Sequence, residues 1–167
     1  MMIPSPQENP SLESASLRWS LSFASGYLAL GMVRDAAREL GKLPLSEKCR
    51  SEVIDLRIQV MLARKQWKQA YRLACIAMRM FPGLIGFYRQ AALACEARGN
   101  PAEAKRIWCS VPSLFHQSGF FHYKIAGYEA QLGNTDRAQE HIALALRLDP
   151  DIEKDLGSLN LPASPLA

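Results

Sequence analysis

Small and apolar residues recur along this chain with a spacing of 34 residues. One column of the repeat is alanine in every copy: Ala36, Ala70, Ala104 and Ala138. Twelve residues before each alanine the residue is small or apolar, namely Ala24, Ile58, Ala92 and Ala126. Seven residues after each alanine the column is again apolar, with Leu43, Ala77, Val111 and Ala145. Columns that agree in one register indicate an internal structural repeat, in which each unit packs on its neighbours.

Turn-forming residues mark the boundaries inside each repeat. Five residues before the alanines stand Gly31, Lys65, Gly99 and Gly133, and asparagine follows the last two glycines. Glycine and asparagine tolerate a positive φ, so this column predicts a tight turn between two helices. Pro82 and Pro150 are expected to end the second helix of their repeats, because proline cannot continue a helix.

The pattern therefore predicts four helix pairs and an all-α fold. The expected helices cover residues 14–30 and 33–43, 47–64 and 67–80, 84–98 and 101–111, and 119–132 and 135–148. Pro44 and Pro112 interrupt two connections between repeats early. The second helices of repeats one and three are thus expected to be short.

The helix pairs form one predicted domain, residues 14–156, with repeats at about 17–50, 51–84, 85–118 and 119–152. Residues 1–13 contain three prolines and no helical period. We expect them to form a disordered leader. Residues 157–167 also lack ordering signals, and we expect them to form a flexible tail.

A 34-residue period with these small and turn-forming positions resembles the tetratricopeptide repeat (TPR). The fourth unit carries the resemblance most closely, through Ala126, Gly133, Ala138, Ala145, Leu148, Asp149 and Pro150. The resemblance covers roughly residues 17–150 and points to small four-repeat proteins of bacterial type. It implies a TPR-like right-handed superhelix, an α–α solenoid that serves as a non-catalytic scaffold for protein or peptide partners. The alternative is an unrelated helical bundle with alanine-rich contacts.

In the family, the first helices of successive repeats line a groove, and the resemblance assigns groove positions to this chain. Those that would face a partner include Arg18, Gln59, Arg89, Leu93, Phe120 and Tyr123. The family's clamp for a peptide carboxylate is not expected, because acids, leucines and glycines occupy its places. A mixed groove with an aromatic end suits an extended or helical segment with apolar anchors. The alternative is that these aromatic side chains pack between repeats.

The distribution of charge is more informative than the net charge of +4. Between Leu56 and Cys95 the chain has seven arginines and lysines and no acid. Four of them define what we call the basic belt: Arg64, Lys65, Lys68 and Arg72. The belt suits an acidic protein or lipid surface, and the alternative is a solvated outer face. Nucleic acid is not expected as a partner, because no recognisable nucleic-acid-binding module is present.

No catalytic, cofactor-binding or metal-binding residues are predicted. The cysteines lack Cys-x-x-Cys spacing, and Cys75 and Cys109 share one repeat position, where small buried hydrophobic residues are expected. Among the three histidines, His116 and His122 flank a loop that can bring them close, but no acid or nucleophile is placed to assist them. We therefore expect no enzyme activity.

The chain has no run of 18 apolar residues, so no membrane span is expected. Residues 19–33 are uncharged, as in a signal peptide, but their small residues follow the repeat register. The protein is therefore expected to be cytoplasmic. The favoured function is an adaptor for a protein or peptide, and the alternatives are a TPR-type secretion chaperone holding an export substrate or a self-assembling structural subunit.

The C-terminal end of the array is predicted to need a cover. The last predicted helix carries Ile142, Leu144, Leu146 and Leu148. Only residues 151–156 remain to form a cap, and a terminal repeat without a polar cap is a solubility liability. A homodimer through this end, a partner, or the tail folding back would each bury it.

Overall fold

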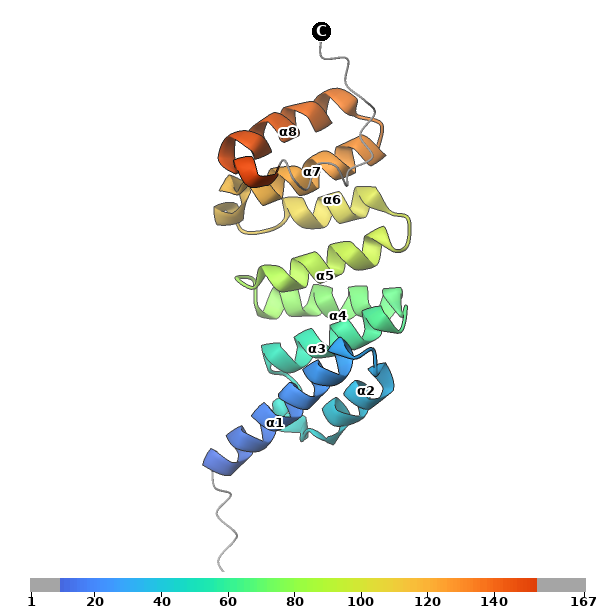
Figure 1. Cartoon of the computed structure of the whole chain (residues 1–167), viewed down its shortest axis with the longest axis vertical. Helices are drawn as coiled ribbons and strands as arrows, with labels where there is room; N and C mark the ends of the chain where they lie inside the picture. Colours follow the sequence, from blue (N-terminus) through green and yellow to red (C-terminus); the bar gives the residue numbers. More distant parts are fainter. Residues whose placement is uncertain (1–9, 153–167) are drawn as a thin grey trace, which may run out of the picture. The chain divides into compact units, whose positions relative to one another are not determined.

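The computed structural model describes residues 10–152, and the regular structure in this range is entirely helical (Figure 1). The α-helices are α1 (Pro10–Ala29), α2 (Val33–Lys42), α3 (Ser51–Ala63), α4 (Trp67–Met80), α5 (Ile85–Glu96), α6 (Pro101–Cys109), α7 (Gly119–Gln131) and α8 (Thr135–Leu148). Short 3-10 helices follow three of them: η1 (Leu45–Glu47), η2 (Ser113–Gln117) and η3 (Pro150–Ile152). The predicted all-α fold with four helix pairs is confirmed.

The helix boundaries differ from the predicted ones mainly at the chain start and at α3, which begins at Ser51 and not at residue 47 because η1 precedes it. The first helix begins at Pro10, so the last four residues of the expected leader are helical, and residues 1–9 lie outside the described range. The expected tail, 157–167, also lies outside it. The second helices of repeats one and three are short, as predicted, with 10 residues in α2 and 9 in α6.

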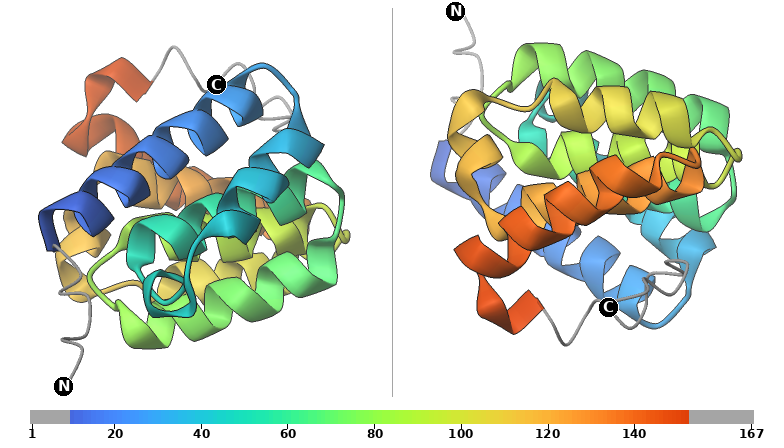
Figure 2. Two further views of the ribbon diagram at one scale, coloured as in Figure 1. Left: turned by 90° about the horizontal axis from the view of Figure 1, so that it is seen from below. Right: turned by 90° about the horizontal axis from the view of Figure 1, so that it is seen from above.

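The chain forms two compact units, with the boundary between Gln66 and Trp67. The first unit contains α1, α2 and α3, and the second contains α4 to α8. In the first unit, α1 and α2 pack on each other and both pack on α3. In the second unit, α4 packs on α5, α5 on α6, α6 on α7, and α7 on α8, and this last pair lies side by side (Figure 2).

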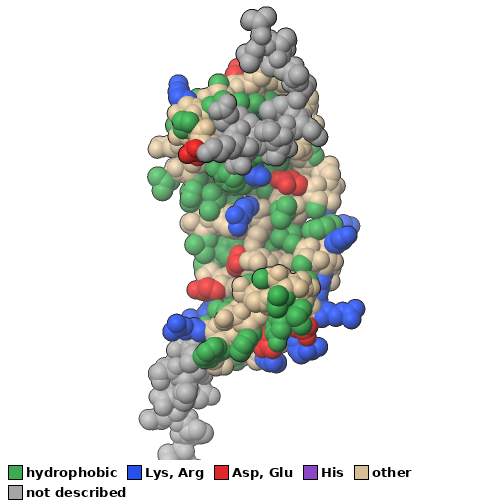
Figure 3. Space-filling view, in the orientation of Figure 1, with side chains coloured by type: hydrophobic (Ala, Val, Ile, Leu, Met, Phe, Trp, Pro, Cys, Tyr) green, Lys and Arg blue, Asp and Glu red, His purple; other side chains and the backbone are tan. Residues whose placement is uncertain are grey.

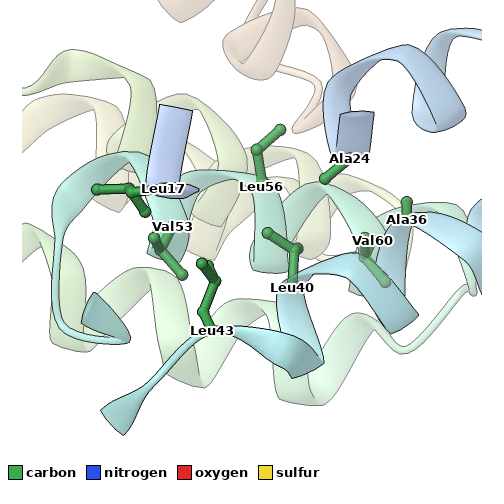
Figure 4. Packing of buried hydrophobic residues seen from close by; sticks show 8 residues of the cluster. All are labelled: Leu17, Ala24, Ala36, Leu40, Leu43, Val53, Leu56 and Val60. Carbon is green, nitrogen blue, oxygen red and sulfur yellow. The ribbon is translucent and has the colours of Figure 1, made fainter. Parts of the chain in front are cut away.

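The core of the first unit contains three residues of the repeat columns, Ala24, Ala36 and Leu43, together with five larger aliphatic side chains that the columns did not identify. Figure 4 shows them converging from all three helices: Leu17, Ala24, Ala36, Leu40, Leu43, Val53, Leu56 and Val60. Two of these are the small residues Ala24 and Ala36, one from each helix of the first pair, and both are fully buried. Because neither carries more than a methyl group, α1 and α2 can approach closely here.

The same two columns are buried throughout the chain. The exposed fraction is 0% or 1% at Ala24, Ile58, Ala92 and Ala126, and at Ala36, Ala70, Ala104 and Ala138. The burial predicted for these positions is therefore confirmed. Protein interiors are packed as densely as organic crystals, so little space remains at these positions for a larger side chain.

The turns inside the four repeats share one backbone conformation. Their φ angles are positive: 72° at Gly31, 58° at Lys65, 68° at Gly99 and 81° at Gly133. In each turn the next amide donates to the carbonyl five residues earlier, through Met32 to Tyr27, Gln66 to Met61, Asn100 to Cys95 and Asn134 to Glu129, at 2.8–3.0 Å. This pattern is the Schellman cap that ends many helices. Lys65 takes the glycine conformation despite its Cβ atom.

Two tyrosine–glutamate hydrogen bonds join successive repeats in the second unit. The Tyr71 hydroxyl donates to Glu103 at 2.6 Å and links α4 to α6. The Tyr128 hydroxyl donates to Glu96 and links α7 to α5. Glu103 also accepts two bonds from Arg106. Arg106 first, and Tyr71 second, lower the pKa of Glu103 to about 2. This carboxylate is therefore charged when it fixes α6 against α4.

A buried ion pair joins the last two repeats. The carboxylate of Glu129, on α7, lies 2.6 Å from the ammonium of Lys105, on α6, and accepts a further bond of 2.8 Å from Asn134. Burial by itself would raise the pKa of Glu129, but Lys105 and Asn134 outweigh it and lower the pKa. The buried carboxylate of Glu129 therefore stays charged because Lys105 and Asn134 both stabilise it.

We expect Lys65→Gly to stabilise the protein. A residue with a Cβ in the left-handed region costs about 1–2 kcal/mol, and the greater freedom of glycine in the unfolded chain offsets part of that gain. The net gain should be roughly 0.5–1 kcal/mol, measured by urea unfolding. Lys65→Ala is the control, since it removes the same charge and keeps the strain. Lower stability for the glycine variant would contradict this reading of the turn.

We expect Ala104→Leu to destabilise the protein by about 1–3 kcal/mol, because the added atoms overpack the contact between α5 and α6. Ala102 lies on the same helix and is exposed, so Ala102→Leu is the matched control and should leave stability nearly unchanged. Thermal melts followed by circular dichroism measure both. Equal melting temperatures for the two variants would show that the alanine column is not a tight contact.

Candidate functional site

The expected groove residues fall on the first helices of the repeats and are divided between the two units. Arg18, on α1, and Gln59, on α3, are exposed residues of the first unit. Gln59 donates to Asp55 at 2.7 Å. The other four expected groove residues belong to α5 and α7 of the second unit.

On α5, Arg89 and Leu93 are one helical turn apart and both exposed, with 47% of Leu93 accessible. On α7, Phe120 is 44% exposed. The hydrogen bond from Tyr128 to Glu96 links α7 to the last residue of α5. The two helices thus present an exposed leucine and an exposed aromatic ring, accompanied by a cation.

Phe120 is held in place by its neighbours. Its ring meets Trp108 edge to face, with 5.7 Å between ring centroids, and lies 6.3 Å from the ring of Tyr123. The ammonium of Lys124 lies 5.8 Å from the Phe120 centroid. A ring supported on one side and open on the other can receive an apolar side chain without much loss of conformational entropy.

Tyr123 differs from the expectation. Only 9% of it is exposed, and it packs with Ala145 of α8 and Ile152 of η3. Its packing supports the patch around Phe120 rather than offering a contact surface of its own. The alternative that aromatic residues pack between elements therefore describes Tyr123, because η3 folds back onto α7 and covers it.

The basic belt is solvent-exposed along its whole length. Arg64 caps α3, Lys65 forms the turn, and Lys68 and Arg72 lie on α4. No ion pair among the described residues involves any of the four. The belt crosses the boundary between the units, so Arg64 and Lys65 are placed with the first and Lys68 and Arg72 with the second.

The histidines gather at the last repeat, with His116 in η2 just before it and His122 and His141 within it. The Nδ1 atoms of His122, on α7, and His141, on α8, lie 3.0 Å apart with the rings stacked, and His116 stacks on Phe121. Sequence reasoning brought only His116 and His122 together. The missed signal was that His141 lies on the helix paired with that of His122. One ring of the pair must donate and the other accept, so at least one is neutral.

The histidine pair lies in a partly buried setting that disfavours its charged forms. Among residues 10–152, no group of three or more histidine, cysteine or acidic side chains is arranged to hold a metal ion. Burial first, and the charges of His141 and His116 next, lower the pKa of His122. Burial also lowers the pKa of His141, against the opposing charges of Glu129 and Glu140. The pair is therefore best described as a neutral hydrogen bond between α7 and α8.

The cysteines only partly follow the expectation of burial. Cys95 is buried and Cys75 is half-buried, whereas Cys109 and Cys49 are exposed, and all four are free thiols. The prediction for Cys109 is wrong because α6 ends at this residue, and the Ser110 that follows is exposed as well. None of the helices in the described part of the chain combines the length and hydropathy that crossing a membrane requires.

Because of the histidine pair, we expect the free energy of unfolding to fall as the pH drops. Both pKa values are lowered in the folded protein, so the stabilisation is complete above the unfolded value of about 6.5 and is lost progressively below it. His141→Asn keeps a polar partner for His122 and removes one titrating ring, so its stability should depend less on pH. Urea unfolding between about pH 7.5 and 5 tests this. An identical pH dependence in the variant would contradict it.

No model of a known protein family matches the sequence, and no curated protein matches it either. Solved structures do match. One is the crystal structure of TTC0263, a thermophilic TPR protein of Thermus thermophilus, with 18% identity, a TM-score of 0.67, and coverage of 84% of this chain and 79% of that one. Another, described as MamA MSR-1 C2, has 17% identity, a TM-score of 0.66, and coverage of 86% and 82%.

At these identities the likeness shows the fold and leaves function open. That fold agrees with the 34-residue period, the buried alanine columns and the repeated turns of this chain. The chain therefore has the helical-repeat fold of tetratricopeptide proteins, as its sequence period predicted.

Proposed function

We propose that the chain is a non-catalytic scaffold that binds a protein or peptide segment on the surface of α5 and α7. The observation that carries this proposal is the open, supported ring of Phe120. Leu93 and Arg89 are exposed on α5, which Tyr128 of α7 reaches through its hydrogen bond to Glu96. A TPR-like fold favours this use, because successive first helices form a continuous surface for an extended partner.

The chemistry of the surface defines the segment it would take. Phe120 and Leu93 suit apolar side chains, and Arg89 and Lys124 suit an acidic residue between or beside them. The ring of Phe120 and the side chain of Leu93 would supply most of the affinity, since buried aromatic and aliphatic anchors dominate such interfaces. The charges would set orientation and the rate of association.

The test starts from a segment captured by the whole protein and identified by mass spectrometry, then synthesised as a peptide. Phe120→Ser and Leu93→Ser should each weaken its binding by about tenfold, measured by isothermal titration calorimetry. Leu114→Ser is the control, because Leu114 lies in η2 of the same unit and is 75% exposed. Equal affinities for all three variants would remove this surface from the proposal.

The basic belt is proposed as the contact for an acidic part of the same partner. Reversing Lys68 and Arg72 to glutamate should leave folding intact and weaken binding, most strongly at low salt, where screening is least. The control is to change Arg34 and Arg79 to glutamate. Both residues are exposed, and this variant has the same net charge but keeps the basic belt. If both double variants bind the partner like the original protein at low ionic strength, the belt is only a solvated face.

Other expectations from the sequence stay predictions, including the cytoplasmic location, the secretion-chaperone alternative and the homodimer through the C-terminal end. At that end, Leu148 is 46% exposed, and a shallow hollow on α8 is lined by Glu140, Ala143, Leu144 and Arg147. The rest of the expected cover falls in residues 153–167, outside the described range.

A further inference from the structure

A stripe of exposed apolar side chains runs along one face of α1. Trp19 is 65% exposed, Phe23 53% and Leu30 74%. With Gly26 between Phe23 and Leu30, the four positions are four, three and four residues apart. This spacing places all four on the same face of the helix. The amide of Leu30 donates to the carbonyl of Gly26 at 3.1 Å, so helical geometry continues through Leu30. We call these four residues the α1 stripe.

The α1 stripe is not the core face of the helix. The core face carries Leu17 and Ala24, which are buried against α2 and α3 (Figure 4). Figure 3 shows hydrophobic side chains reaching the surface over this part of the first unit. Soluble monomers rarely keep large contiguous apolar patches on their surface. The stripe therefore calls for a partner surface.

The shape of the α1 stripe is complementary to itself. If two copies of α1 lie antiparallel, with a two-fold axis between Phe23 and Gly26, Trp19 faces Leu30 of the second copy. Phe23 then faces Gly26 of the second copy. No atom lies within 4 Å of the place where a Cβ of Gly26 would stand, so there is room for a ring. The rings of Trp19 and Phe23 are already stacked, with centroids 6.1 Å apart.

The lack of charged residues along the α1 stripe also favours a second copy of the chain as its partner. No residue from Trp19 to Val33 is charged. Two copies can therefore meet here without repulsion between like charges and without burying an unpaired charged side chain. A helix that lies on a lipid surface typically carries many lysines and arginines on its polar face. Over its whole length α1 has one arginine, Arg18, and one acid, Glu13. Lipid is therefore the less suitable occupant.

We propose that the α1 stripe binds the α1 stripe of a second copy, forming an antiparallel helix pair in a homodimer. Each aromatic side chain buries at most about 150–250 Å², so the stripe is smaller than the roughly 800 Å² per partner of a standard interface. The dimer is accordingly weak and depends on protein concentration. This pairing is independent of the peptide surface on α5 and α7, and it would place two such surfaces in one particle.

Sedimentation velocity on the full chain, over a roughly 100-fold range of concentration, tests the pairing. The original protein should pass from monomer to dimer. Trp19→Ser combined with Phe23→Ser should stay monomeric with an unchanged circular dichroism spectrum, because both side chains are exposed. Leu144→Ser combined with Leu148→Ser changes the C-terminal end instead and should still dimerise.

Gly26→Leu is the sharper variant. The monomer has space for the new side chain, and leucine is a better helix former than glycine, so its melting temperature should hold or rise. The same side chain fills the place of Phe23 from the second copy, so dimerisation should weaken by about tenfold or more. A stable variant that no longer dimerises distinguishes the proposed antiparallel contact from general hydrophobic association.

Three results would overturn the proposal. One is a protein that stays monomeric at every concentration. A second is a dimer that survives both α1 stripe variants, or that only the C-terminal variant abolishes. The third is a monomer that binds neutral phosphatidylcholine vesicles through Trp19 and Phe23, which would assign the stripe to lipid.

Discussion

The close approach of paired helices at small residues is the constraint on which this structure depends. Ala24 and Ala36 meet in the first pair, and the equivalent positions in every repeat are fully buried. Helices that approach so closely need a short connection, which the positive-φ turn supplies. A larger side chain in either column would separate the pair and shift the helices that pack on it.

Polar contacts then set how one repeat meets the next. Tyr71 with Glu103, Tyr128 with Glu96, and Lys105 with Glu129 each link different helices of the second unit. Such contacts add little net stability, because removing charged groups from water offsets much of the attraction. Their value lies in specificity, since a shift of one helix would leave a buried carboxylate without a partner.

What the helices do not bury is available for binding. The second unit leaves Phe120 and Leu93 open, and the first unit leaves Trp19, Phe23 and Leu30 open. The first set lies beside cations, whereas the second lies in an uncharged stretch. This difference in charge is the physical basis for assigning the first set to a peptide and the second to another copy of the chain.

The sequence by itself determined the repeat, the helix pairs and the positions of their turns, because a local period is enough to specify them. It also identified the alanine contacts, since a small residue repeated in register has few other uses. The sequence-based predictions failed where the burial of a side chain depends on the elements that pack around it or on where its helix ends. Tyr123 was expected in the groove, but η3 folds over it, and Cys109 was expected to be buried, but its helix ends there.

Only the tertiary structure brought His122 to His141 and left the α1 stripe uncovered. Helical spacing assigns a residue to a face of its helix. The elements that pack against a helix decide which of its faces are covered. The spacing of residues within that one helix contains no information about those elements.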